Sequence, residues 1–123
     1  MKVTIVDGII IKNNKILLLK KLSKDYYETP GGKKEENETQ EKCLVRELRE
    51  EIGIRPTKFK KFTDLKLNFE NKDITDHIFI IESFEGNPKI TEKHIFEKLE
   101  WVDIEKMKKL NLAPNVKKLE KVI

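Results

Sequence analysis

Three glutamates near the middle of the chain have a spacing that could bind a cation. Glu47, Glu50 and Glu51 stand at positions i, i+3 and i+4, so a helix would place their Cβ atoms within about 6 Å on one side. Arg46 can pair with Glu50, but one guanidinium cannot neutralise three acids. Clustered carboxylate oxygens suit a hard cation such as Mg²⁺, which bridges carboxylates to substrate phosphates. The alternative is a solvated acidic stripe without chemistry.

An amphipathic helix is predicted to position these glutamates. Apolar residues recur every four positions, at Leu44, Leu48 and Ile52. This stripe can pack on a sheet while the acidic stripe faces a cleft. Asn37 or Thr39 can cap the start of the helix, and Gly53 is typical of the left-handed residue that ends one. Gly31-Gly32, before the helix, allows the backbone to turn sharply and approach a ligand closely.

The segment around this helix resembles the Nudix box, G-x5-E-x7-R-E-U-x-E-E-x-G-U, in which U is aliphatic. Residues 32 to 54 read GKKEENETQEKCLVRELREEIGI. Every fixed position is filled, by Gly32, Glu38, Arg46, Glu47, Leu48, Glu50, Glu51, Gly53 and Ile54. A gapless match of this length is far more specific than a lone glycine motif. By this resemblance the chain is identified as a MutT-like Nudix hydrolase.

The resemblance implies a role for each residue of the box. The glutamates matching Glu47, Glu50 and Glu51 bind the metal, often with the carbonyl matching Gly31, and Arg46 orients them. The resemblance also implies that Gly32 and Glu38 belong to the substrate-binding set, and that Glu38 supports the helix. The implied cofactor is Mg²⁺, for which Mn²⁺ can substitute. Water would attack one phosphorus of a nucleoside diphosphate linked to a group X, while the metal neutralises charge.

The general base is left open by the resemblance, because family members place it either on the glutamate matching Glu47 or on an acid in a later loop. Glu92, Glu97 and Glu100 are available before Trp101. We select Glu97 as the candidate catalytic base, although acids in loops are usually only solvated.

The candidate substrate is a nucleoside triphosphate, including an oxidised one such as 8-oxo-dGTP, hydrolysed to the monophosphate and pyrophosphate. Residues 112 to 115, Leu-Ala-Pro-Asn, resemble the segment of mutator-type members in which an asparagine reads the base, which makes Asn115 a candidate. Tyr27 could stack on the base. Asn115 as a simple helix cap remains an alternative. The alternative functions are a pyrophosphatase for ADP-ribose or another nucleoside diphosphate derivative, and a catalytically silent nucleotide-binding module.

Composition indicates one domain spanning residues 1–123, with a small-molecule partner. The chain has 39% charged residues and a formal charge of only +4, and these charges are too dispersed to favour polymeric nucleic acid. A single cysteine, Cys43, excludes an internal disulfide, and no signal peptide or long apolar run is evident. We therefore expect a cytoplasmic monomer or homodimer without membrane contact.

The predicted elements build an α/β (α+β) fold, the Nudix-type α/β/α sandwich with a mixed sheet between helices. Asn13-Asn14 is typical of a two-residue hairpin turn. Uninterrupted apolar runs on both sides of this turn predict strands that are covered on both faces. The predicted strands are 2–12, 15–21, 26–29, 59–69, 74–84 and 99–102, and further helices are predicted over 104–110, capped by Asp103, and from 114 or 115 to 122.

Overall fold

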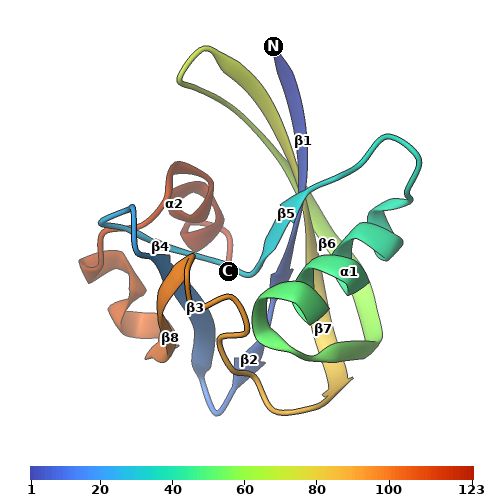
Figure 1. Cartoon of the computed structure of the whole chain (residues 1–123). Helices are drawn as coiled ribbons and strands as arrows, with labels where there is room; N and C mark the ends of the chain where they lie inside the picture. The colour runs from blue at the N-terminus through green and yellow to red at the C-terminus, as the bar shows by residue number, and fades with distance from the viewer.

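The computed structural model describes residues 1–123 as a sandwich of sheets between helices (Figure 1). In chain order its elements are β1 (Lys2–Ile9), β2 (Ile11–Lys12), β3 (Lys15–Lys21), β4 (Tyr27–Glu28), β5 (Gly31–Lys33), α1 (Gln40–Ile52), β6 (Arg55–Phe69), β7 (Lys72–Glu85), β8 (Phe96–Asp103), the 3₁₀ helix η1 (Ile104–Lys109) and α2 (Pro114–Glu120).

Two sheets form the middle layer. The first has the strand order β5-β1-β7-β6, and the second contains β2, β3 and β4, with β8 paired to β3. The β1 and β7 strands run parallel, whereas the other pairs are antiparallel. Helix α1 lies on one side of the strands, and α2 and η1 lie on the other (Figure 1). The predicted α/β/α sandwich with a mixed sheet is confirmed.

The first hairpin is shorter than the sequence predicts. Asn13 and Asn14 have φ angles of 51° and 63°, which confirms the turn. Only Ile11–Lys12 pairs with β3, however, while β1 leaves it and pairs with β7 from Lys2 to Ile9. This separation allows β1 to become an interior strand of the first sheet, and its second half, from Val6 to Ile9, is buried.

Several other boundaries also differ from the prediction. The segment Gly31–Lys33, for which the sequence analysis predicts no strand, pairs with β1 because glycine can still form a strand ladder. The β6 strand begins at Arg55 and accommodates Pro56 next to a register shift. The helix after Asp103 is 3₁₀, and the Asp103 side chain makes no capping hydrogen bond.

Two apolar clusters fill the space between the layers. The first joins α1 to the sheets and contains Val6, Ile10, Leu17, Leu19, Cys43, Leu44, Leu48, Ile52, Ile54, Phe79, Ile81 and Phe96. The second lies beneath η1 and α2 and contains Ile9, Ile16, Leu18, Ile78, Met107, Leu112, Ala113, Val116 and Leu119. Successive residues of β3, from Ile16 to Leu19, alternate between the two clusters, because successive side chains of a strand point to opposite faces.

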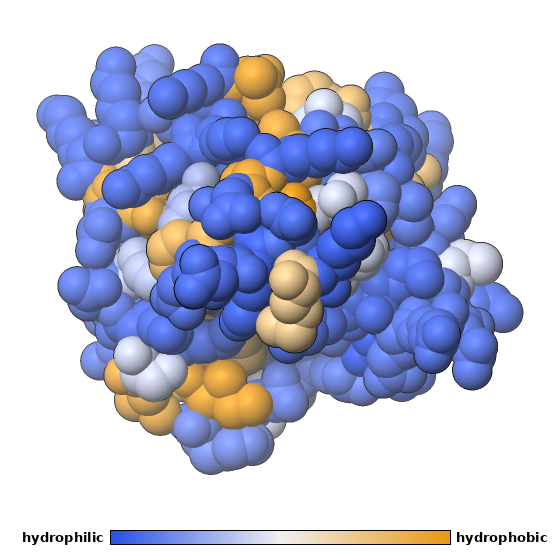
Figure 2. Space-filling model, turned by 90° about the horizontal axis from the view of Figure 1, so that it is seen from above, coloured by the Kyte–Doolittle hydropathy of each residue, from blue (hydrophilic) through white to orange (hydrophobic).

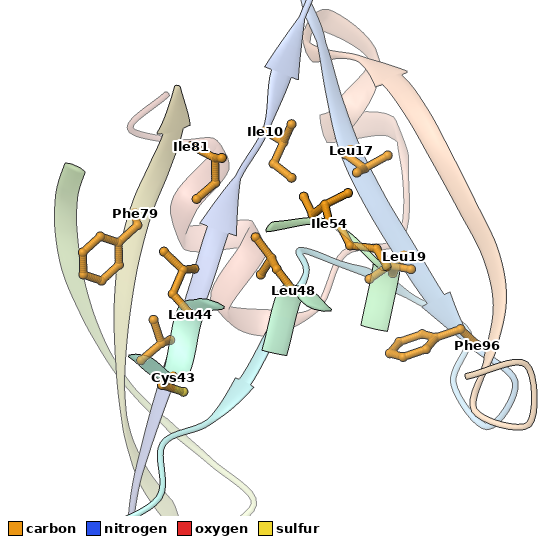
Figure 3. Packing of buried hydrophobic residues seen from close by; sticks show 12 residues of the cluster. Ile10, Leu17, Leu19, Cys43, Leu44, Leu48, Ile54, Phe79, Ile81 and Phe96 are labelled. Carbon is orange, nitrogen blue, oxygen red and sulfur yellow. The ribbon is translucent and has the colours of Figure 1, made fainter. Parts of the chain in front are cut away.

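Helix α1 is fixed at both ends and along its apolar stripe. Thr39 accepts a hydrogen bond from the Lys42 N–H, and Gly53 adopts the left-handed conformation that ends the helix. Leu44 and Leu48 point into the first cluster, toward the strands (Figure 3). The remaining faces of the helix are therefore free to carry the acidic residues.

The surface is mostly hydrophilic. The face in Figure 2 carries a near-continuous cover of polar side chains, with apolar side chains in small separate groups. None of the helices has the length and apolar character needed to cross a membrane.

Truncation of the α1 core should unfold the protein at milder conditions. Leu48 is 0% exposed, so Leu48→Ala should lower the free energy of unfolding by about 2 to 5 kcal/mol. Lys42→Ala, at an exposed position of the same helix, should change it by less than about 0.5 kcal/mol. Urea titration followed by circular dichroism measures both. Equal midpoints for the two variants would contradict the packing described for α1.

Candidate active site

A strongly acidic cavity of about 530 Å³ opens beside α1. Its walls come from α1, β1, β5, the β6–β7 hairpin and the start of α2. The acidic residues that line it are Asp7, Glu28, Glu47, Glu50, Glu51 and Glu92, against only two basic ones, Lys21 and Lys33. The three predicted glutamates of α1 therefore meet in a cavity and not in open solvent.

Arg46 is the cation that organises the exposed half of the acidic stripe. Its Nε and Nη2 donate to Glu38 at 3.0 and 2.6 Å, and its Nη1 donates to Glu47 at 2.9 Å and to Glu50 at 3.4 Å. Nη2 also donates to the Lys33 carbonyl oxygen at 3.1 Å. The hydrogen bonds from Arg46 lower the pKa of Glu38 to about 2. Glu38 thus supports Arg46 and is absent from the cavity lining.

Glu51 has a different environment from its two neighbours. Glu51 is 7% exposed and makes no salt bridge, and its Oε1 accepts a hydrogen bond from the Gly31 N–H at 2.8 Å. Burial is the largest cause that raises its pKa, the Gly31 N–H partly opposes this, and the negative charge of Glu47 adds to the rise, so that the pKa is about 9. Burial also raises the pKa of Glu47, whereas Arg46 lowers it. A carboxylate as buried as Glu51 requires a proton or a cation.

The two glycines allow β5 to approach the acidic groups. Gly31 has a φ of 152°, and a Cβ there would overlap the Asp7 side chain and the Val6 carbonyl. A Cβ on Gly32 would lie 2.5 Å from the Glu47 carboxyl carbon. Because neither glycine has a side chain, the backbone of β5 can lie directly against the carboxylates.

Two of the three candidate acids, Glu92 before β8 and Glu97 within it, have different surroundings. Glu97 is exposed, its Oε2 pairs with Lys20 at 2.6 Å, and it is not part of the cavity lining. Hydrogen bonding from Lys20 lowers the pKa of Glu97. Glu92 lines the cavity, and its charge helps to raise the pKa of Glu47. The structure therefore places Glu92, and not the selected Glu97, beside the glutamates of α1.

The tyrosine that lines the cavity is Tyr26, one residue before the predicted Tyr27. The Tyr27 hydroxyl donates to Glu100 at 3.1 Å, and Tyr27 is not in the cavity lining, whereas Tyr26 is. Tyr27 belongs to β4, where neighbouring side chains point to opposite faces. The structure therefore places Tyr26, which directly precedes β4, and not Tyr27 on the wall of the cavity.

Asn115 lies at the end of the cavity formed by α2. It does not cap the helix, because Ala113 occupies the cap position. Its amide nitrogen donates to Asp7 at 3.1 Å and to Asp76 at 2.8 Å. Sequence reasoning missed both aspartates, although an acid within an apolar strand was a signal that could have identified them.

The comparisons with known proteins agree with this geometry. The NUDIX domain model matches residues 1–122. The chain belongs to the NUDIX domain family. The resemblance seen in residues 32 to 54 and the expectation of a MutT-like Nudix hydrolase are thereby confirmed.

Relatives of this Nudix protein include two enzymes that are named for nucleotides with different bases. The 8-oxo-dGTP diphosphatase of Buchnera aphidicola subsp. Schizaphis graminum (strain Sg) is 37% identical over 121 residues, covering 94% of this chain and 89% of the relative. The CTP pyrophosphohydrolase of Escherichia coli (strain K12) is 31% identical over 116 residues, covering 91% and 84%. The crystal structure of the MutT NUDIX hydrolase from Burkholderia pseudomallei has a TM-score of 0.90 at 20% identity, covering 98% and 97% of the two chains, which shows a shared fold.

The donor set of the Nudix box fits a divalent cation chemically. Carboxylate oxygens outnumber cationic groups around the cavity, and Glu51 forms no salt bridge, although Lys21 lies near enough to lower its pKa. No three acidic, histidine or cysteine side chains converge as a finished metal site. Glu47 and Glu50 instead turn to Arg46, and Glu51 turns to Gly31. Binding a cation therefore requires these side chains to exchange part of their present hydrogen bonding.

The buried state of Glu51 predicts a pH dependence of stability in metal-free protein. The folded carboxyl keeps its proton up to a pH of about 9, whereas the ordinary pKa of this group is 4.5. The folded state therefore binds more protons between these values, and stability falls as the pH rises. In EDTA, the unfolding free energy of the wild type should fall through this range relative to Glu51→Gln.

Thermal or urea unfolding at a series of pH values measures this difference. Glu41→Gln, at an exposed position of α1 outside the cavity, is the matched control and should follow the wild type. Excess Mg²⁺ should remove the decline, because a cation favours the ionised carboxylate. Parallel curves for wild type and Glu51→Gln in EDTA would show that Glu51 is not a buried, cation-requiring acid.

Proposed function

We propose that this Nudix protein is a divalent-cation-dependent pyrophosphohydrolase that converts a nucleoside triphosphate and water to a nucleoside monophosphate and pyrophosphate. The observation that carries the proposal is the meeting of Glu47, Glu50 and Glu51 with the Gly31-Gly32 backbone in one cavity. The named activities of the relatives, an 8-oxo-dGTP diphosphatase and a CTP pyrophosphohydrolase, support this reaction class.

Glu47, Glu50, Glu51 and the Gly31 carbonyl would hold the cation, which we propose to be Mg²⁺, with Mn²⁺ as a substitute. The cation supplies charge neutralisation at the phosphate oxygens and lowers the pKa of bound water. Arg46 keeps Glu47 and Glu50 on one side of the cavity through its hydrogen bonds at 2.9 and 3.4 Å. Its role is positioning.

Other residues of the cavity supply a proton acceptor and contacts to the substrate. Glu92 is the acid available to accept the proton of the attacking water, because Glu97 is engaged by Lys20 outside the cavity. Lys21 and Lys33 line the same cavity and attract the polyphosphate chain. Tyr26 and Asn115 are the groups on the wall suited to contact the base.

A catalytically silent module fits the chain less well. The acidic lining and the buried Glu51 destabilise the fold unless a cation is bound, so a binding module that uses no cation has no physical reason to keep them. Hydrolysis of ADP-ribose remains an outcome that a substrate panel separates, because it yields two monophosphates and no pyrophosphate.

The decisive experiment follows the products of metal-dependent hydrolysis. With Mg²⁺, deoxynucleoside and ribonucleoside triphosphates, including 8-oxo-dGTP, should give the monophosphate and pyrophosphate, detected by anion-exchange chromatography and ³¹P NMR. Glu50→Gln should lower kcat by about 10²-fold or more, as expected for the loss of a charge-stabilising group, without changing the melting temperature. Glu41→Gln is again the control. Wild-type kcat in Glu50→Gln would overturn the cation-binding assignment.

A matched pair of variants identifies the general base. Glu92→Gln should lower kcat by about 10² to 10⁴-fold, the usual contribution of general base catalysis, and should abolish the acidic limb of the pH–rate profile, where protonation of the base reduces the rate. Glu97→Gln, five residues away and outside the cavity, should retain kcat within about twofold because it removes only an exposed ion pair. Steady-state kinetics across pH measures both. A larger loss of kcat in Glu97→Gln than in Glu92→Gln would instead assign the general base to Glu97.

A further inference from the structure

The loop between β7 and β8 is bound to the last turn of α1 (Figure 1). The final carbonyl oxygens of a helix have no donors within the helix, and in α1 they belong to the turn that carries Glu50 and Glu51. The Gly53 N–H reaches back to the Arg49 carbonyl at 3.1 Å. The carbonyls of Glu50, Glu51 and Ile52 need donors from elsewhere in the chain.

Two residues of this loop supply those three donors. The Lys89 N–H donates to the Ile52 carbonyl at 3.0 Å. The Thr91 N–H donates to the Glu51 carbonyl at 3.2 Å, and the Thr91 hydroxyl donates to the Glu50 carbonyl. Thr91 by itself therefore binds the backbone of two glutamates of the Nudix box.

Close packing holds the same segment against the end of the helix. A Cβ on Gly53 would lie 3.2 Å from the Thr91 methyl carbon. A Cβ on Gly86, at the start of the loop, would lie 2.9 Å from the Gly53 carbonyl oxygen. Ile90 packs against the first apolar cluster. The loop is thus fixed on α1 by packing as well as by hydrogen bonds.

Glu92 follows Thr91 directly and depends on this anchor. It lines the cavity, but its carboxylate has no hydrogen-bond or salt-bridge partner in the protein. Its carbonyl oxygen accepts from the Ile95 N–H at 2.9 Å and from the Phe96 N–H at 3.0 Å, and Phe96 is buried in the first apolar cluster. The backbone on both sides of Glu92, and not a contact of its own carboxylate, therefore sets where its side chain meets the cavity.

Proton transfer is sensitive to this placement. A general base must lie within hydrogen-bond reach of the proton that it accepts, and a displacement of about 1 Å can lower a rate by about 10²-fold. In the proposed reaction, the glutamates of α1 and Glu92 act on the same water molecule. Their separation must therefore stay constant, and a direct link between the two backbones keeps it so.

We infer that Thr91 is a positioning residue, which holds Glu92 at a fixed place relative to the turn of α1 that carries Glu50 and Glu51. This inference rests on the proposed function in taking Glu92 as the proton acceptor. Thr91 is absent from the cavity lining, so it acts through Glu92 and not by touching the substrate.

A pair of substitutions at Thr91 tests this role by kinetics. Thr91→Val keeps the shape and the methyl group but removes the hydroxyl, whereas Thr91→Ser keeps the hydroxyl. With Mg²⁺ and the triphosphate that the wild type hydrolyses fastest, Thr91→Val should lower kcat by about tenfold and leave KM within about twofold, since the two backbone hydrogen bonds of the loop remain. Thr91→Ser should retain kcat within about twofold of the wild type.

Thr57→Val is the matched control, because it removes another exposed hydroxyl, which is paired with Ser83 outside the cavity. It should retain the kcat and KM of the wild type. Wild-type kcat in Thr91→Val would overturn the inference, and so would an equal loss of kcat in Thr91→Val and Thr91→Ser.

A double-mutant cycle shows whether Thr91 acts through Glu92. The effects of independent residues on kcat multiply, whereas those of coupled residues do not. In the Glu92→Gln protein, the further change Thr91→Val should lower kcat by less than about twofold, because no base is left to position. A further loss as large as that in the wild-type background would overturn the inference.

Amide hydrogen exchange tests the link to α1 without turnover. The protection factors of the Lys89 and Thr91 N–H groups should fall by about threefold or more in Thr91→Val, as expected for the loss of one hydrogen bond, and should be retained in Thr91→Ser. The urea midpoint of Thr91→Val should match that of Thr57→Val, because both side chains are exposed. Equal protection in wild type and Thr91→Val would show that the hydroxyl does not hold the loop.

Failure of the proposed reaction gives a different result. If no triphosphate is hydrolysed, the reaction is refuted, and the exchange data decide separately whether Thr91 holds the loop on α1. Wild-type kcat in Glu92→Gln would refute both the base assignment and the positioning role. A slow Glu92→Gln together with wild-type kcat in Thr91→Val would support the reaction and refute only the role of Thr91.

Discussion

A row of carboxylates on one helix is stable only if cations balance it, and the fold supplies very few. Arg46 is the single partner of both Glu47 and Glu50 in salt bridges, and Glu51 has none. The surrounding residues maintain this excess of negative charge. Glu38 binds Arg46, and β5 places its backbone, not charged side chains, against the acids. The unmet negative charge is what makes the cavity suited to a divalent cation and its phosphate ligands.

Burial and hydrogen bonding give the two ends of the cavity different properties. On α1, Glu47 and Glu50 are bound by Arg46, whereas Glu51 is buried against the Gly31 N–H. These glutamates can exchange their present partners for a cation. At α2, the amide of Asn115 occupies both Asp7 and Asp76 at 3.1 and 2.8 Å. The acids on α1 can be rearranged, whereas the amide at α2 is fixed by two hydrogen bonds. The polyphosphate and the base of a nucleotide need these two kinds of environment.

The local sequence determined helix α1 and the groups it carries. Thr39 and Gly53 bound the helix as predicted, because capping depends on side chains only a few residues away. The spacing of Glu47, Glu50 and Glu51 fixes their common side in the same way. The turn at Asn13-Asn14 was also predictable, since positive φ angles are a local property. For these elements the sequence alone was sufficient.

The tertiary structure decided which distant residues meet the helix. Tyr26 and not Tyr27, and Glu92 and not Glu97, line the cavity, because strand alternation and loop paths depend on pairing with remote segments. The contact between Asp76 and Asn115 joins residues 39 positions apart, and no local pattern records it. Periodicity and capping are short-range, so the sequence alone determined the helix and its acidic face. Strand order and the closing of the cavity are long-range, so only the folded chain could set them.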